Sequence, residues 1–495
     1  MGNPGIQADL PDEPEPFDFL KLFIDCDLLM VMRRETNRYA DQEIRRLQQA
    51  HKLKPHSLLT KWKNVTLNEI RCFFAIIIHM SIVHKPSIND YWSVNPVLSA
   101  AFPSKLMTRD RFKQILTCFH LNDNQNGTAG NDPLHKIRPV YDILNEKFKS
   151  VYNLEENVAI DEAICPFRGR VKFRVYMPNK PNKWGIKLYE LCESSSGYVY
   201  SFEVHAADEH VSYSPSEVVL RLMVPLLGQG HTVYVDNYYT CPGLFDDLVA
   251  NDTMAVGTVR PNRREMPVDF KSMKVKKGDI EFRCRDGVLA IKWKDKREVH
   301  VLTTKHEPVM VNVQSRYEMK RKPAAVQDYI TNMAGVDHSD QLISYMPFHR
   351  KTQKWWKKLF FHLFCLTIIN SHILHNKFLR ANNKPQWRLE KFFLALAQSF
   401  VDDAGEDVNG AANIADTNRL TARHFISHIP PTDGKDKPTR VCKVCNEKAK
   451  KNGLGIGKGQ RKRKETRFWC SDCGIALCFE PCFRAYHTLK DYTSC

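Results

Sequence analysis

The sequence of 495 residues lacks a long uninterrupted apolar run. Its two most apolar stretches, residues 70–83 and 359–374, are interrupted by polar side chains such as Arg71 and Asn370. A membrane-spanning helix requires about 18 or more consecutive apolar residues, so we expect none. The first 20 residues contain no lysine, no arginine and no apolar core, and we therefore expect neither a signal peptide nor a transit peptide.

Acidic side chains are fewer than basic ones. Aspartate and glutamate number 56 against 73 lysines and arginines, which gives a net charge of +17. Such an excess is typical of proteins that bind a polyanion, with nucleic acid a better candidate than an anionic membrane. Hydrophobic residues at 43% and charged residues at 26% are ordinary values and exclude wholesale disorder. At roughly 150 residues per domain, the length predicts about three domains.

Clustered cysteines are absent from the first 441 residues, where eight of the 15 cysteines are scattered singly. That scatter is typical of buried thiols in a reducing compartment. The other seven lie in the last 54 residues: six form two CxxC pairs followed by two further cysteines, with a histidine close behind, and the seventh is Cys495. Thiolates and an imidazole at this spacing predict structural zinc sites, and two closed sites need eight ligands. The seven visible ligands are Cys442, Cys445, Cys470, Cys473, Cys478, Cys482 and His487.

The pattern of the sequence changes along the chain. Residues 1–16 are polar and acidic, which predicts a disordered tail. Residues 66–69, Thr-Leu-Asn-Glu, form a capping box ahead of an apolar run, and residues 111–121 have a helical apolar face. Further on, short apolar runs at 158–160 and 232–235 predict strands, and the second run is followed by a helix-like segment at 244–249, which favours an α/β domain.

Four aspartates stand at the ends of predicted elements. Asp161 follows the first apolar run, and Asp236 follows the second. Asp337 and Asp340 are three residues apart and share one face if a helix begins there. Gathered carboxylates require a cation, and two Mg²⁺ ions about 4 Å apart can assist an in-line phosphoryl displacement. Turns also favour aspartate, so the spacing alone leaves a purely structural role open.

Four longer blocks, in order, resemble piggyBac-type transposases, and the resemblance extends from about residue 14 to residue 495. The blocks are Ile160-Asp161-Glu162 with Phe167-Arg168-Gly169-Arg170 and residues 176–187, Tyr-Met-Pro-Asn-Lys-Pro-Asn-Lys-Trp-Gly-Ile-Lys; residues 234–240, Tyr-Val-Asp-Asn-Tyr-Tyr-Thr; residues 335–341, Gly-Val-Asp-His-Ser-Asp-Gln; and residues 350–358, Arg-Lys-Thr-Gln-Lys-Trp-Trp-Lys-Lys.

The resemblance implies an α/β fold. It would have a ribonuclease-H-like catalytic core interrupted by a β-rich insertion, a surrounding helical DNA-binding domain, and a small C-terminal zinc cross-brace module. The expected segments are a disordered tail (1–16), a helical dimerisation and DNA-binding part (17–157), the first part of the core (158–260), a basic β-rich insertion (261–325), the last part of the core (326–346), a second helical part (347–400), a linker (401–420) and a Cys/His-rich domain (421–495).

The resemblance also implies an activity. Asp161, Asp236 and Asp337 would be a catalytic triad that holds two Mg²⁺ ions, with Mn²⁺ as a substitute, and Asp340 would be a fourth carboxylate. The family cuts and rejoins DNA at TTAA by hydrolysis, hairpin formation and strand transfer. The expected partner is duplex DNA with terminal repeats and a TTAA target, bound by a homodimer in the nucleus, without a membrane or a small-molecule substrate.

Basic and aromatic residues in these blocks would contact DNA. Their alternatives are a solvated helix face for the lysines and core packing for the Trp355–Trp356 pair. The expected DNA-binding residues are Arg168, Arg170, Lys183 and Lys187 near the carboxylates, and Arg350, Lys351, Lys354, Trp355 and Lys357 along the DNA path.

Related members have a histidine upstream of the first CxxC pair, which makes His424 the expected eighth zinc ligand, with His428 and Cys495 as alternatives. Three functional hypotheses remain at this point. The first is an active transposase, which the four intact aspartates favour. The second is a catalytically silent, transposase-derived protein that binds DNA or chromatin. The third is a nuclease that cuts without rejoining.

Overall fold

The computed structural model describes residues 3–125, 132–178, 180–208, 210–314, 318–346, 348, 352–405, 424–432, 434–451, 464–471, 473–489 and 491–493. The chain divides into two compact units. The large unit comprises residues 1–100 and 109–404, and the small unit comprises residues 405–495 with the short segment 101–108. Of the helices in the described ranges, none is both long and apolar enough to cross a membrane.

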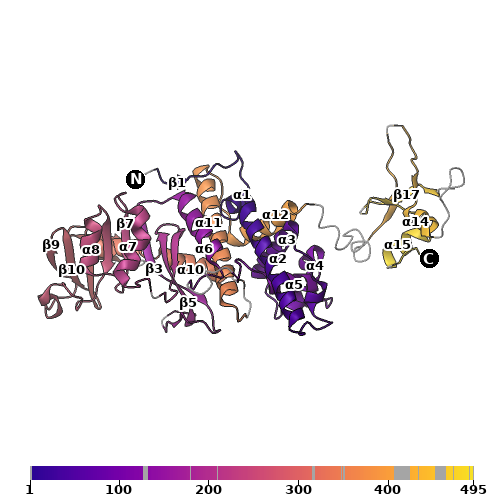
Figure 1. The fold of residues 1–495 in the computed structure, drawn as a ribbon. Coiled ribbons are helices and arrows are strands. Elements are labelled where there is room, and N and C mark those ends of the chain that lie inside the picture. The colour runs from indigo at the N-terminus through magenta and orange to yellow at the C-terminus, as the bar shows by residue number, and fades with distance from the viewer. Residues whose placement is uncertain are drawn as a thin grey trace. The chain divides into compact units, whose positions relative to one another are not determined.

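The large unit contains a nine-stranded sheet, which lies beside the unit's helical part (Figure 1). Three antiparallel strands, β6, β5 and β3, are followed by β7 and β8, which run parallel to β3. This order is that of a ribonuclease-H-like core. The strands are β3 (Asn157–Pro166), β4 (Arg174–Tyr176), β5 (Trp184–Glu193), β6 (Val199–Val204), β7 (Thr232–Val235), β8 (Met254–Thr258), β9 (Ile280–Arg285), β10 (Val288–Lys294) and β11 (Glu298–Thr303).

The strands form where the apolar runs predict them. Residues 232–235, Thr-Val-Tyr-Val, make up β7, and all four are buried because this parallel strand is covered on both faces. Helices α9 (Ala324–Asn332) and α10 (Gly335–Tyr345) cover the face that carries Ala159 and Tyr234. Helices α7 (Pro215–Met223) and α8 (Pro242–Val249) lie in the connections before and after β7.

The β-rich insertion is not a separate module, which the sequence did not predict. Strand β11 pairs with β8 through Val301–Thr258 and Thr303–Val256, so β11, β10 and β9 extend the core sheet. Without β11, β8 would present an open sheet edge, and the pairing covers it. Figure 1 shows β9 and β10 at the end of the sheet far from α2 and α3. Strands β12 (Met310–Gln314) and β13 (Met319–Pro323) form a separate antiparallel pair.

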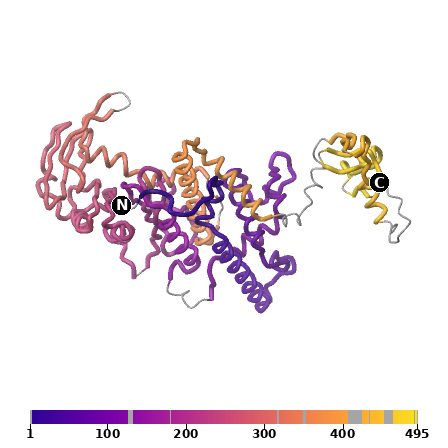
Figure 2. Tube along the Cα trace, turned by 90° about the horizontal axis from the view of Figure 1, so that it is seen from above, coloured from indigo at the N-terminus to yellow at the C-terminus, as the bar shows by residue number. Residues whose placement is uncertain are grey.

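Helices from the two ends of the large unit pack together. Helix α12 packs on α3 and α1 packs on α11, so segments far apart in sequence lie side by side (Figure 2). Helix α11 is buried nearly all round, as expected for a helix that is apolar on every face. The helices are α1 (Pro16–Lys21), α2 (Cys26–Gln49), α3 (Leu67–Ile82), α5 (Arg109–Cys118), α6 (Arg138–Ser150), α11 (Trp355–Ala381) and α12 (Leu389–Asp403).

The capping box is confirmed at the start of α3. The Thr66 hydroxyl accepts from the Glu69 amide at 3.2 Å, and the Glu69 carboxylate accepts from the Thr66 amide at 3.0 Å. The helix expected at residues 111–121 is also confirmed, as α5, although it begins two residues earlier and ends at Cys118.

Part of the segment predicted to be a disordered tail is paired with the rest of the large unit. Gly5 and Ile6 form β1, which pairs with β2 (Tyr152–Asn153), and the Gln7 amide donates to Val151 at 2.8 Å. These backbone hydrogen bonds hold the segment despite its polar composition. At the other end of the unit, α12 includes residues 401–403 of the expected linker, and residues 406–423 lie outside the described residues.

The small unit has a core made largely of cysteine. Cys442, Cys470, Cys478 and Cys482 are buried with a few apolar side chains such as Tyr486. So small an apolar core is typical of a module stabilised by metal. Its described elements after residue 405 are β14 (Ile426–His428), β15 (Arg440–Val441), β16 (Glu465–Thr466), β17 (Phe468–Cys470), β18 (Ile475–Ala476), α14 (Lys443–Lys451) and α15 (Cys482–Thr488).

Candidate active site and metal-binding module

Asp161 and Asp236 lie at the same edge of the sheet. Strands β3 and β7 are parallel and their last paired residues are Ile160 and Val235, so each aspartate follows directly at the same level. Asp236 turns the chain after β7, because its carboxylate accepts from the Tyr238 amide at 2.8 Å. Asp161 remains within β3, which continues along β5.

Helix α10 brings Asp337 and Asp340 to this edge. The helix packs on β3 and β5, and Gly335 at its start permits a close approach. A Cβ atom on Gly335 would lie 3.1 Å from the carbonyl oxygen of Glu193, at the end of β5. The two aspartates are three residues apart and therefore lie on one face of the helix.

Lys180 lies among these carboxylates, and the sequence alone did not single it out. Its ammonium nitrogen is 3.6 Å from a carboxylate oxygen of Asp337. Burial lowers the pKa of Lys180, but the negative charges of Asp161, Asp337 and Asp340 outweigh burial and raise it. Lys180 therefore lies within electrostatic reach of all three carboxylates.

Tyr329 of α9 lies within electrostatic reach of Asp236 and of two of the other aspartates. Burial raises the pKa of its phenol to about 12, and the charges of Asp236, Asp161 and Asp337 add to the effect. All four aspartates predicted from the sequence are therefore near one another, although they come from three separate segments.

The electrostatics of this edge favour a bound cation. Burial, followed by the neighbouring Glu162, raises the pKa of Asp161 to about 8. Burial also raises the pKa of Asp340 to about 6 and raises that of Asp236. Carboxylates that resist ionisation when crowded and buried are stabilised by a divalent cation, and their oxygen donors suit Mg²⁺ or Mn²⁺. The donor set therefore fits such ions.

The arrangement is open rather than a closed ligand shell. The four aspartates are not among the groups of described residues whose ligand atoms all lie within 4.8 Å of one another. The side chain of Asp337 is 69% exposed. A cavity of about 550 Å³ adjoins the edge, lined by Lys180, Asp337 and Asp340 together with Phe361 and His362 of α11. A large substrate can therefore reach the carboxylates.

Two lysines expected to contact DNA are engaged within the protein. Lys187 is buried and pairs with Glu162 at 2.9 Å, because its side chain points into the core from β5. Lys357 is buried and donates to the carbonyl oxygens of Leu116 and Thr117 at 2.6 and 2.9 Å, which caps the end of α5. Burial lowers the pKa of Lys357 to about 7. In this structure neither ammonium group is available to a phosphate.

The other residues expected to bind DNA are distributed as follows. Arg168, Arg170, Lys183 and Lys354 are exposed, and Arg350 and Lys351 lie outside the described residues. Trp355 is half-buried and packs edge-on against Phe173, with ring centroids 5.1 Å apart. Its neighbour Trp356 is buried beside His120, so core packing, the alternative to stacking on DNA, describes the second tryptophan.

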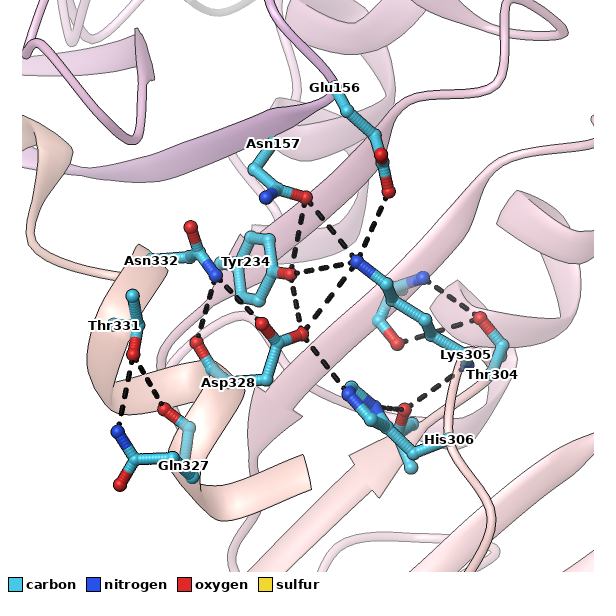
Figure 3. Close-up of polar contacts among 12 residues, drawn as sticks. Glu156, Asn157, Tyr234, Thr304, Lys305, His306, Gln327, Asp328, Thr331 and Asn332 are labelled. Carbon is cyan, nitrogen blue, oxygen red and sulfur yellow. Dashed lines mark hydrogen bonds and ion pairs between the residues drawn. The ribbon is translucent and has the colours of Figure 1, made fainter. Parts of the chain in front are cut away.

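A polar network fixes β7 to α9 two residues before Asp236 (Figure 3). Asp328 lies at its centre and accepts from the Tyr234 hydroxyl at 2.7 Å. His306 and Lys305, which follow β11, lie 3.1 and 3.8 Å from the same carboxylate. Because Tyr234 and Lys305 also contact Asn157 at the start of β3, the network ties β7, α9 and the segment after β11 together at the opposite end of the β3–β7 pairing from Asp161 and Asp236.

The small unit holds two groups of potential metal ligands. In each, the ligand atoms all lie within 4.8 Å of one another. The groups alternate along the chain, which is the interleaving of a cross-brace. The first group is His424, Cys470, Cys473 and His487, and the second is Cys442, Cys445, Cys478 and Cys482.

The surroundings of these groups suit a metal. His487 Nδ1 lies 2.8 Å from the Phe483 carbonyl oxygen, which leaves Nε2 to face Cys473 at 3.6 Å. The described cysteines form no disulfides. The structure places His424 in the first group, whereas His428 lies outside both groups, with its ring tilted against that of Phe468. Cys495 lies outside the described residues.

The comparisons with known proteins agree on one family. A family model described as Transposase IS4 matches residues 15–372, a segment that contains all four aspartates. Human PiggyBac transposable element-derived protein 3 is 25% identical over 496 residues, which cover 96% of this chain and 76% of that protein. Human PiggyBac transposable element-derived protein 2 is 24% identical over 395 residues, covering 75% of this chain and 63% of that protein.

A solved structure shares the fold. The cryo-EM structure of a piggyBac transposase synaptic complex with hairpin DNA superposes with a TM-score of 0.74 at 22% identity. The match covers 97% of this chain and 98% of that chain, so the inserted strands and the small unit are included in the likeness. By its family match and its fold, the chain belongs to the piggyBac transposase family.

Proposed function

We propose that the chain is a metal-dependent DNA transposase that cuts, forms hairpins and transfers strands at TTAA sites. The observation that supports this most strongly is the meeting of Asp161, Asp236, Asp337 and Asp340 at one open edge of a ribonuclease-H-like sheet. Three segments that are far apart in sequence converge there, as a two-metal phosphoryl-transfer site requires.

The four aspartates and the exposed basic residues have separate roles in the proposed reaction. Asp161, Asp236 and Asp337 hold two Mg²⁺ ions, with Asp340 as a fourth carboxylate. When bound there, such ions stabilise charge on the attacking and leaving oxygens of an in-line displacement. The exposed Arg168, Arg170, Lys183 and Lys354 neutralise backbone phosphates and set the register of the duplex.

The reaction proceeds by successive displacements at phosphorus. Water attacks a strand at the transposon end and releases a 3′-hydroxyl. That hydroxyl attacks the opposite strand, which closes a hairpin and frees the flanking DNA. After water opens the hairpin, the same hydroxyl attacks a phosphodiester of a TTAA target. The protein forms no covalent bond to DNA in this sequence.

The small unit is proposed to bind two zinc ions through its two Cys/His groups. With them in place, the module would present a folded surface for DNA. We also propose that the protein acts in the nucleus as a homodimer, because two transposon ends must be held together.

The test uses purified full-length protein, Mg²⁺ and duplexes that carry the ends of its own element flanked by TTAA. We expect nicks, hairpins and strand-transfer products, all lost in Asp236→Ala. Absence of every product with intact protein that still binds the duplex would instead support a silent DNA- or chromatin-binding descendant. Nicks without hairpins or joined products would indicate a nuclease.

A further inference from the structure

A buried carboxylate that the proposed mechanism does not use lies beside the catalytic edge. Glu190 of β5 is 0% exposed. Within the described residues, neither of its carboxylate oxygens has a hydrogen-bond partner. An ionised carboxylate buried alone costs several kcal/mol, so this side chain needs either a cation or a proton.

Glu193, three residues further on the same strand, is a buried carboxylate that does have hydrogen-bond and ion-pair partners. It is also 0% exposed. It accepts from the Tyr152 hydroxyl at 2.8 Å and from the Glu155 amide at 3.0 Å, and it pairs with Lys377 at 2.8 Å. Among the residues that the structure describes, one buried glutamate of β5 therefore has hydrogen-bond partners and the other has none.

The position of Glu190 points to the metal centre. In the antiparallel pairing of β3 and β5, Glu190 stands directly opposite Asp161, so the two side chains share a face of the sheet about 5 Å apart at Cβ. Helix α10 covers this face, since a Cβ atom on Gly335 would lie 3.3 Å from the Cβ of Cys192, two residues beyond Glu190. Glu190 therefore lies beside Asp161 on the sheet face that is covered by α10, the helix that carries Asp340.

Electrostatic effects at neighbouring groups agree with this placement. Burial raises the pKa of the Cys192 thiol, and the charges of Glu190, Asp340 and Asp161 raise it further. The same two aspartates raise the pKa of Glu190 beyond the effect of burial, while Lys180 lowers it. The three carboxylates and Lys180 are therefore close enough to influence one another electrostatically.

We propose that Glu190 is a fifth carboxylate of the metal centre, which binds a divalent cation directly or through one water beside Asp161 and Asp340. The proposal rests on the proposed function, because it needs a metal at the four aspartates. Glu190 lies outside the four sequence blocks that carry the family resemblance, so those blocks did not point to it as a metal ligand.

The test measures metal binding rather than catalysis. Zinc-loaded full-length protein is titrated with Mn²⁺, and bound ions are counted by electron paramagnetic resonance. We expect Glu190→Gln to weaken Mn²⁺ binding about tenfold or more, as loss of a ligand or of a group that orients one does. Glu193→Gln, the matched buried glutamate, is expected to leave Mn²⁺ affinity unchanged.

The outcomes separate the two proposals. No Mn²⁺ binding by the wild type would overturn the proposed metal-dependent function itself. Wild-type binding that is retained in Glu190→Gln would overturn the assignment and leave Glu190 as a protonated core residue. Thermal melting without Mn²⁺ checks the fold, and Glu190→Gln is expected to melt no lower than the wild type. If it does melt lower, Glu190→Met, which also lacks the donor, must show the same weakening for the proposal to stand.

Discussion

The pair formed by Lys187 and Glu162 shows how a single contact decides the role of a residue. Its charges lie inside the core at 2.9 Å. Removing one partner leaves the other charge buried, so Lys187→Met is expected to lower the free energy of unfolding by about 3–5 kcal/mol. Urea denaturation measures this, with the exposed Lys183→Met as the control. A loss of stability as small as that of the control would contradict the buried ion pair. Lys187 would then again be a candidate for contact with DNA.

Histidines buried in the helical part predict acid sensitivity. Burial lowers the pKa of His362 to about 4. Below its ordinary value of 6.5 the unfolded chain binds a proton that the folded protein does not, so stability falls as the pH drops from about 6.5 to 4. His362→Phe is expected to reduce this loss by up to about 3 kcal/mol. Denaturation at pH 7 and pH 4.5 tests it against exposed His56→Phe, and equal losses in both variants would contradict the assignment.

Among the elements, α3 depends on its first turn. Thr66 and Glu69 satisfy each other's backbone amides in the capping box. Thr66→Ala is expected to cost about 1 kcal/mol of stability, whereas Thr66→Ser keeps the hydroxyl and most of the stability. Chemical denaturation of the three proteins measures the difference. Equal losses for alanine and serine would show that the threonine methyl, not the cap, matters.

Elements with a local cause could be predicted from the sequence. The apolar run 232–235 is β7, and the capping box begins α3, because strand burial and helix capping depend on neighbouring residues. Pairing between distant segments could not be predicted. The joining of β11 to β8 and of β1 to β2 depends on backbone hydrogen bonds that carry no sequence signal.

In the candidate site, too, some residues could be predicted from the sequence and others could not. Asp161 and Asp236 follow apolar runs and could be identified as strand-end carboxylates, and a family resemblance supplied their joint role. The roles of Lys180 and Glu190 could not be predicted, because they depend on residues that are close in space but not in sequence. The sequence shows the charge of Lys357 but not the carbonyl groups that it caps, so the sequence alone predicts a DNA contact for this residue.

At the scale of the whole molecule, the two units are expected to respond differently to loss of metal. Zinc analysis of the purified protein is expected to give about two ions per chain, and Cys442→Ser and Cys473→Ser, one in each ligand group, are each expected to lose zinc. Because a module with so small an apolar core folds on its metal, each change is expected to unfold the small unit and leave the melting of the large unit in place. Cys284→Ser, at an exposed lone cysteine, is the control. Two zinc ions retained in Cys442→Ser would contradict the second ligand group.

The net charge of +17 is compatible with many polyanion-binding proteins, and the large unit narrows that choice. It carries exposed basic residues and an open acidic edge, and the proposed reaction needs both, for DNA and for divalent metal. The claim that the four aspartates form one metal site is tested most directly by Fe²⁺-directed cleavage of the protein, in which ascorbate and peroxide generate radicals at bound iron. We predict backbone cuts close to residues 161, 236 and 337–340, lost together in Asp236→Asn and suppressed by excess Mg²⁺. Cuts confined to the small unit, or unchanged in Asp236→Asn, would contradict a metal site at this edge.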